Sequence, residues 1–262
     1  MNEGVRMIEA ILSCWLLVMA FMFLVFILAQ ILKDNSIIDI AWGLGFVLVA
    51  WFLFFFYSTV YPRKVILLLL ISIWGIRLAA YIFLRRRGKA EDFRYRAFRT
   101  KWKRYFFLKM FFKIYMFQGI LLTVISIPVI LVSGSEPSPL GIFDYLGILV
   151  FGVGFLFEVI ADYQKSVFKR LPENSSRLMT RGLWRFSRHP NYFGESLLWW
   201  GIWILSLSVP TGWIGVISPA LLTFLLVFVS GIPMLEKSYA GRPDFIEYKA
   251  RTPVFIPWFP RG

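Results

Sequence analysis

Four ionisable side chains between residues 158 and 169 have the spacing of a single helix face. They are separated by four, three and four residues: Glu158, Asp162, Lys165 and Lys169. On a helix, residues three and four positions apart lie one above another on the same side. The acids fall in an apolar stretch and the lysines at its polar end. This face could bind a ligand with both hydroxyl and phosphate groups, although a ladder of salt bridges on the helix surface has the same spacing.

The segment 181–195 contains groups suited to binding phosphate. Pro190 suits the first position of a helix, where free N–H groups and the positive end of the helix dipole favour anions. Guanidinium groups bind phosphate through paired hydrogen bonds. Three of them precede this proline: Arg181, Arg185 and Arg188. The segment therefore predicts a phosphate site at the start of a helix.

The residues after Pro190 extend this prediction into the helix. Asn191 and Glu195 lie four residues apart and share a face with Trp199. A polar entrance followed by a polar and aromatic helix face indicates a slot for a nucleotide cofactor, with His189 and Tyr192 at its mouth. A lone histidine beside a proline could also be purely structural.

The C-terminal tail could complete such a slot. Glu236, Tyr248 and Lys249 follow the last apolar stretch, and we expect them to reach back towards the cofactor. The chain has one histidine and one cysteine, which argues against a metal site built from these residues.

The elements that position these candidate residues are predicted to be helices that cross a membrane. Of the 262 residues, 58% are hydrophobic and 17% charged, against about 25% charged in a typical soluble domain. The apolar residues form runs of about 20, enough to cross a hydrocarbon core of roughly 30 Å. We predict an all-α, polytopic membrane bundle with seven spans: 7–31, 37–57, 63–83, 107–132, 142–162, 193–209 and 211–233. The first run is too long for a typical signal peptide, so we expect a retained helix.

The charge distribution predicts the topology. The net charge is +14, and the basic residues concentrate in 85–109, 165–188 and 237–261. Seven spans would place all three segments on one side, which the positive-inside rule identifies as cytoplasmic. This arrangement predicts an outside N-terminus and a cytoplasmic C-terminus, and it favours anionic headgroups over nucleic acid as the partner of these charges.

Ionisable residues inside the spans are costly and usually face an interior. Asp39 and Arg77 lie at similar predicted depths in the second and third spans. They could form an ion pair that locks two helices, or they could line a substrate pocket.

The chain resembles a known family over most of its length. Residues 182–195 (GLWRFSRHPNYFGE) are similar to the C-terminal signature of steroid 5-alpha-reductase-like membrane proteins, in particular the branch known as domain of unknown function 1295. Further similar motifs are Asp39–Gly43, Trp74–Leu78, Glu91–Tyr95, Glu158–Gln164 and Ser230–Glu236.

This resemblance implies a seven-helix reductase that uses NADPH. It implies that residues 1–132 form the substrate side and residues 142–262 the cofactor side. Asp162, Asn191 and Glu195 match cofactor-binding positions of the family. The animal steroid reductases hold the enone carbonyl with a glutamate and a tyrosine. That glutamate has no match here, and the candidates to replace the pair are Asp39, Tyr81 and Tyr95.

The expected reaction is hydride transfer to the β carbon of an electron-poor double bond, with a side-chain acid stabilising the enolate oxygen. A pocket within the bilayer indicates a hydrophobic substrate, such as an isoprenoid, sterol-like or fatty enone. The expected location is the inner or plasma membrane of a bacterium, or an endomembrane such as the endoplasmic reticulum of a eukaryote.

Two alternatives remain open at this stage. The Arg188–Gly194 pattern is also similar to membrane methyltransferases of the isoprenylcysteine type, which use S-adenosylmethionine. Those enzymes commonly carry paired glutamates before the tail, whereas Lys237 follows Glu236 here. The third possibility is a non-catalytic protein that binds lipid and has no cofactor affinity.

Overall fold

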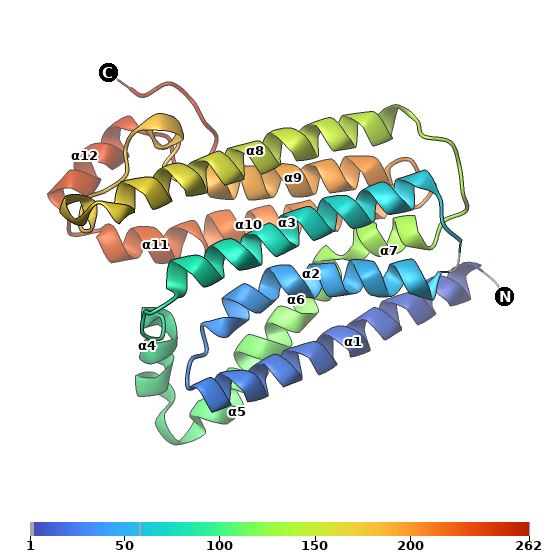
Figure 1. The fold of residues 1–262 in the computed structure, drawn as a ribbon, viewed down its shortest axis with the longest axis horizontal. Coiled ribbons are helices and arrows are strands. Elements are labelled where there is room, and N and C mark those ends of the chain that lie inside the picture. The colour runs from blue at the N-terminus through green and yellow to red at the C-terminus, as the bar shows by residue number, and fades with distance from the viewer. Residues whose placement is uncertain (1–2, 58, 262) are drawn as a thin grey trace. The chain divides into compact units, whose positions relative to one another are not determined.

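The computed structural model describes residues 3–57 and 59–261, which form helices joined by loops and contain no strand (Figure 1). The predicted all-α class is confirmed. The chain divides into two compact units, residues 1–140 and 141–262.

The first unit begins with three long helices and continues through shorter ones. In chain order the helices are α1 (Glu3–Leu32), α2 (Ile37–Phe56), α3 (Pro62–Arg86), α4 (Phe93–Trp102), α5 (Phe106–Met110), α6 (Phe117–Ile125) and α7 (Ile127–Ser133). A π-helical segment, Phe111–Met116, joins α5 to α6. Gly43 of α2 and Gly75 of α3 meet backbone to backbone: a Cβ on either would lie 2.5–2.6 Å from the carbonyl oxygen of the other.

The second unit contains one long helix, one of intermediate length and several short ones. They are α8 (Ile142–Arg170), α9 (Pro190–Ser206), α10 (Ile217–Phe224), α11 (Ile232–Tyr239) and α12 (Pro243–Arg251). A π-helical segment, Leu225–Val229, leads from α10 towards α11, and short 3₁₀ turns lie at 172–174, 182–185 and 212–216. The start of α9 and the ends of α8 and α11 meet at one end of the unit, beside α12 (Figure 1).

Six helical segments of the described chain are long and apolar enough to cross a membrane. They are 7–32, 37–56, 62–86, 93–125, 142–170 and 212–239. The chain is therefore a multi-pass integral membrane protein, as predicted. The expected span at 193–209 corresponds to α9, whose 17 residues reach about 25 Å at 1.5 Å per residue, the short end of the spanning range.

Helices α8 and α9 pack through glycines with a seven-residue spacing. Gly154 of α8 faces Gly194 of α9, and Gly147 faces Gly201. A Cβ at Gly154 would lie 2.4 Å from the backbone nitrogen of Leu198 and 2.7 Å from the carbonyl oxygen of Gly194. Small residues at such crossings let two membrane helices approach closely. This contact fixes the polar end of α8 beside the start of α9.

Candidate functional site

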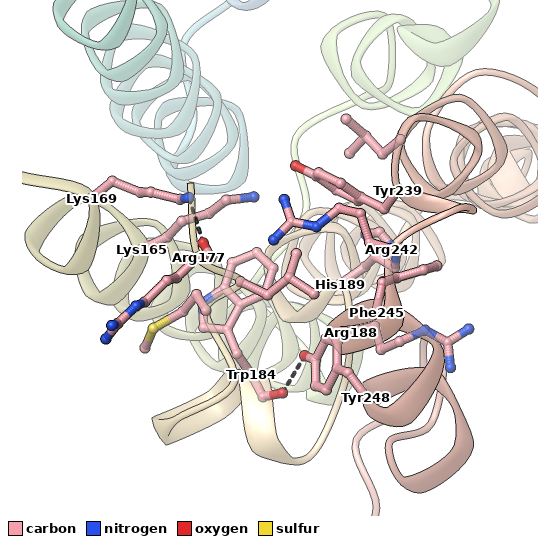
Figure 2. Close-up of a pocket in the computed structure, with 13 residues that line it drawn as sticks. Lys165, Lys169, Arg177, Trp184, Arg188, His189, Tyr239, Arg242, Phe245 and Tyr248 are labelled. Carbon is pink, nitrogen blue, oxygen red and sulfur yellow. Dashed lines mark hydrogen bonds between the residues drawn. The ribbon is translucent and has the colours of Figure 1, made fainter. Parts of the chain in front are cut away.

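A pocket opens at the polar end of the second unit, where α8, α11 and α12 meet the loop before α9. Its lining combines cations with aromatic and apolar side chains: Lys165, Lys169, Arg177, Leu178, Met179, Trp184, Arg188, His189, Leu235, Tyr239, Arg242, Phe245 and Tyr248. Figure 2 shows the α8 lysines on one side and Tyr239 and Arg242 on the other. The cavity measures about 50 Å³, below the roughly 300–1,000 Å³ of a pocket for a whole drug-sized ligand. It has room for a phosphate group or part of a ring.

Two cations of the lining lie over aromatic rings. The Lys165 ammonium lies 4.5 Å from the centroid of Trp184, and the Arg242 guanidinium 5.7 Å from that of Tyr239. Trp184 is buried, and its indole N–H donates to the carbonyl of Ala161 at 3.0 Å. The ring is therefore held in place as a rigid wall of the pocket.

Lys169 and Arg242 hold the loop that carries Arg177. Lys169 Nζ donates to the carbonyls of Asn174, Ser175 and Arg177 at 3.2, 2.8 and 2.5 Å. Arg242 donates to the carbonyl of Ser176 at 2.8 Å. Two cations from separate helical elements thus bind four consecutive loop residues at the mouth of the pocket.

Arg188 is buried in an ion pair instead of facing outward. Its guanidinium donates to both carboxylate oxygens of Glu236, at 2.8 and 3.3 Å, and to the carbonyl of Thr252 at 2.6 Å. Only 8% of Arg188 is exposed. Arg188 lines the pocket, but its charge is largely matched by Glu236.

His189 shares the same carboxylate. Its Nε2 lies 3.1 Å from a Glu236 oxygen, and its ring stacks on Tyr192 with centroids 5.7 Å apart. Burial lowers the pKa of His189 below its ordinary value of 6.5, and Glu236 only partly opposes this shift. The imidazole is therefore neutral at pH 7, so the positive charge beside Glu236 is that of Arg188.

The C-terminal tail is tied to this segment by backbone contacts. The N–H of Arg188 donates to Pro253, the hydroxyl of Ser187 to Phe255, and the N–H of Trp258 to Phe186, over 2.7–2.9 Å. Tyr248 donates from its hydroxyl to the carbonyl of Trp184, and burial raises the pKa of Tyr248. The tail braces the wall of the pocket.

The other predicted residues of this unit have varied surroundings. Glu158 and Asp162 are 2% and 3% exposed, whereas Lys169 at the end of the same α8 face is exposed. Helix α9 begins at Pro190, as predicted. Glu195 and Trp199 on its face are buried, and Asn191 is half-buried.

Some predicted residues lie outside the pocket lining. Arg181, Arg185 and Lys249 are exposed, and none of them is among the lining residues. Conversely, Arg177 and Arg242 line the pocket although the residue pattern did not single them out. Arg242 directly precedes Pro243, the first residue of α12. This position before a helix start is the local signal that could have identified Arg242.

The first unit contains a separate polar cluster around Asp39. Tyr95 donates its hydroxyl to Asp39 at 2.8 Å, and Arg94 donates to the other oxygen at 2.5 Å. Tyr81, the third candidate, lies between two guanidinium groups, those of Arg77 and Arg85, 5.2 and 5.3 Å from its ring. The structure thus joins Asp39 to Tyr95, with Arg94 as a partner that the sequence did not identify.

Loop contacts position this cluster. Asn35, fully buried between α1 and α2, donates from its backbone and side chain to Glu91 at 3.0 and 2.9 Å. The hydroxyl of Tyr115, on the π-helical segment, donates to Asn35 at 3.2 Å. Burial acts to raise the pKa of Glu91, but the hydrogen bonds from Asn35, together with the hydrogen bond and charge of Arg99, outweigh it and leave the pKa low. The charged Glu91 therefore fixes the loop before α4, which carries Arg94 and Tyr95.

Comparisons with known proteins give a family and two relatives. A family described as "Protein of unknown function (DUF1295)" matches residues 25–252. An uncharacterized protein of Schizosaccharomyces pombe is 26% identical over 255 residues, covering 86% of this chain and 73% of that protein. A probable O-methyltransferase, ustE, of Ustilaginoidea virens is 33% identical over 66 residues, 25% of this chain and 22% of that protein. No solved structure matches the chain.

Proposed function

This chain belongs to the DUF1295 family, and we propose that it is a membrane-embedded reductase that uses NADPH to reduce a carbon–carbon double bond in a hydrophobic enone. The proposal joins the resemblance to steroid 5-alpha-reductase-like proteins with the chemistry of the pocket in the second unit. The substrate class comprises steroid-, isoprenoid- or lipid-like enones.

The observation that carries the proposal is the gathering of four cations around aromatic walls. Lys165, Lys169, Arg177 and Arg242 line one pocket with Trp184 and Tyr239. A dinucleotide brings a diphosphate, and NADPH adds a phosphate monoester that alone holds about −1.5 to −2 charges at pH 7. Guanidinium and ammonium groups bind such phosphates. Because the cavity is small, the pocket fits the phosphate-bearing end of the dinucleotide.

The chain's own residues would do the following work. Trp184 offers a rigid flat surface, and the Arg188–Glu236 pair holds the pocket wall in place. When bound, NADPH supplies the hydride. In the first unit, Arg94 donates to the Asp39 carboxylate and holds it in place, and Asp39 orients the Tyr95 hydroxyl. Tyr95 is the group we assign to stabilising the enolate oxygen of the substrate: its hydroxyl, which donates to Asp39 in this structure, would turn to donate to that oxygen.

A second candidate is a methyltransferase that uses S-adenosylmethionine, favoured by the 66-residue similarity to the probable O-methyltransferase. The charge of the pocket argues against it. S-adenosylmethionine carries a positively charged sulfonium and no phosphate, so the surrounding cations, of which Arg242 is already paired with Asp244, would repel it. A non-catalytic lipid-binding protein is the third candidate, and it predicts affinity for neither cofactor.

Ligand-dependent thermal unfolding in mild detergent distinguishes these candidates. A ligand that binds only the folded protein raises its stability, by about 2.7 kcal/mol at 100 times the dissociation constant. We expect stabilisation by NADPH and none by S-adenosylmethionine. Stabilisation by S-adenosylmethionine alone would reject the reductase, and the absence of any effect would favour the lipid-binding protein.

Two arginines of the same loop provide a matched pair for this assay. Arg177 lines the pocket, whereas Arg181 lies four residues away, exposed and outside the lining. Because a hydrogen bond to a charged group contributes about 1.5–3 kcal/mol, Arg177→Gln should weaken NADPH binding by about 10- to 100-fold. Arg181→Gln should change it little; equal losses would mean general charge attraction instead of a site.

Tyr95→Phe tests the catalytic assignment independently of cofactor binding. Loss of one preorganised donor typically lowers kcat by about 10²–10³. We expect that loss in NADPH consumption with an enone substrate, while NADPH still stabilises the variant. Tyr105→Phe, at an exposed tyrosine that follows α4, is the control. A kcat for Tyr95→Phe equal to that of the native protein would remove Tyr95 from the mechanism.

A further inference from the structure

Helix α12 has two faces with different neighbours. Its inner face carries Phe245, which is 5% exposed, and Tyr248, which binds the carbonyl of Trp184. Its outer face carries Ile246, 60% exposed, and Lys249, also exposed. Helix α12 therefore separates two surfaces, and the cationic pocket lies at its inner face.

A groove of about 360 Å³ lies on the other side of α12, between α11 and α12. Its lining is Pro233, Glu236, Lys237, Ala240, Phe245, Ile246 and Lys249. Lys237 and Lys249 are exposed, and the carboxylate of Glu236 is already bound by Arg188 and His189. The groove thus presents an apolar surface and two lysines to a ligand. The charge of Glu236, the one acid in its lining, is already matched by Arg188.

The groove lies where the chain leaves the bilayer. Helix α11 is the end of the apolar segment Gly212–Tyr239, so Lys237 belongs to its last turn. The tail beyond α12 exposes Ile256 (66%), Trp258 (70%) and Phe259 (73%). Large aromatic residues favour the membrane–water interface, and lysines near a helix end extend their charge to the same depth. Both features place this face of the unit against lipid headgroups.

We propose that this groove binds the anionic headgroup of a bilayer phospholipid. Lys237 and Lys249 contact the charged headgroup, and the first carbons of the acyl chains lie against Pro233 and Ile246. A soluble anion would use the lysines and leave the apolar surface in water, whereas a phospholipid covers both. Phe245 lines both the groove and the cationic pocket, and Glu236 of the groove binds Arg188 and His189 of the pocket lining. An occupied groove therefore holds that wall in place. This last step rests on the proposed function.

Retention of lipid by the purified full chain tests the site without any dinucleotide. After delipidation in detergent, phosphatidylglycerol or phosphatidylcholine is added and bound lipid is counted by native mass spectrometry. Each lysine near an anionic surface contributes about fivefold to binding. Lys237→Gln with Lys249→Gln should therefore lower the affinity for phosphatidylglycerol about 25-fold, while the weaker retention of phosphatidylcholine should change little.

The matched control is the double variant Lys89→Gln with Lys101→Gln, at two exposed lysines of the first unit. It removes the same charge and should retain phosphatidylglycerol like the native chain. Equal losses in both double variants would overturn the proposal, because they would show attraction by net charge alone. Thermal stabilisation by inorganic phosphate as strong as that by phosphatidylglycerol would also overturn it.

The coupling to the cationic pocket is measured separately in lipid nanodiscs. NADPH should bind several-fold more tightly in discs containing phosphatidylglycerol than in phosphatidylcholine, and the Lys237→Gln, Lys249→Gln variant should lose this difference. Equal NADPH affinity in both discs would contradict the coupling and leave the lipid site standing. Absence of NADPH binding in every disc would count against the proposed function, whereas lipid retention would still decide on the groove.

Discussion

Gly154→Ala should destabilise the second unit by about 1–3 kcal/mol, the usual cost of forcing extra atoms into a close-packed site. The new methyl group would lie 2.4 Å from the nitrogen of Leu198 and 2.7 Å from the oxygen of Gly194. These are backbone atoms of α9, which cannot turn aside as a flexible side chain would. The helices would have to separate, and dispersion contacts along the crossing would be lost.

Gly152 provides the control for this prediction on the same helix. A Cβ at Gly152 meets nothing within 4 Å, and alanine is the better helix former by up to about 1 kcal/mol. Gly152→Ala should therefore be neutral or stabilising. Thermal unfolding of both variants in detergent measures the difference, and equal unfolding midpoints would contradict the glycine-mediated contact.

The same contact links stability to the candidate site. A Cβ at Gly194 would lie 2.5 Å from the nitrogen of Glu158, so the start of α9 is fixed by the helix that carries Lys165 and Lys169. A variant that pushes the helices apart should weaken NADPH binding together with stability. Gly201 lies two turns further along α9, away from its start. A substitution at Gly201 should lower stability with less effect on NADPH binding, which separates the two losses.

The sequence predicted the membrane helices well because runs of apolar residues have few alternatives to burial in lipid. It failed at interruptions that depend on local geometry. The expected span 107–132 contains a π-helical segment and then a break at Ser126, before Pro128 in the first turn of α7. The expected helix 193–209 ends at Ser206, whose hydroxyl donates to the carbonyls of Trp203 and Gly212. Neither hydroxyl bonding nor a π segment leaves a periodic signal.

The site was predictable where it depended on helix periodicity and not where it depended on distant partners. The α8 face from Glu158 to Lys169 and the start of α9 at Pro190 followed from local spacing. Which arginines face the pocket did not, because Arg188 is turned inward by Glu236, 48 residues later in the chain. Asp39 likewise found Arg94 and Tyr95, 55 and 56 residues away, and composition gives no way to choose such partners.

Removal of the Glu236 charge should have the largest effect on stability. Glu236→Gln leaves the buried guanidinium of Arg188 without its counter-charge, and breaking a buried pair in this way typically costs about 3–5 kcal/mol. Because Arg188 also donates to the carbonyl of Thr252, the strain should reach the tail. We expect a lower unfolding midpoint and faster proteolysis at residues 253–261.

Glu247→Gln is the matched control, since it removes the same charge from the neighbouring helix α12. Glu247 pairs with Arg251 at 3.3 Å, but both side chains are more than 60% exposed, and such pairs contribute about 0.3–0.5 kcal/mol. If both variants lost stability equally, the buried ion pair would not be what holds the tail. A large loss at Glu236 alone would show that the Arg188-His189 segment acts first as a structural anchor. In that case, the phosphate of the cofactor would be bound by the other cations of the pocket lining and not by Arg188.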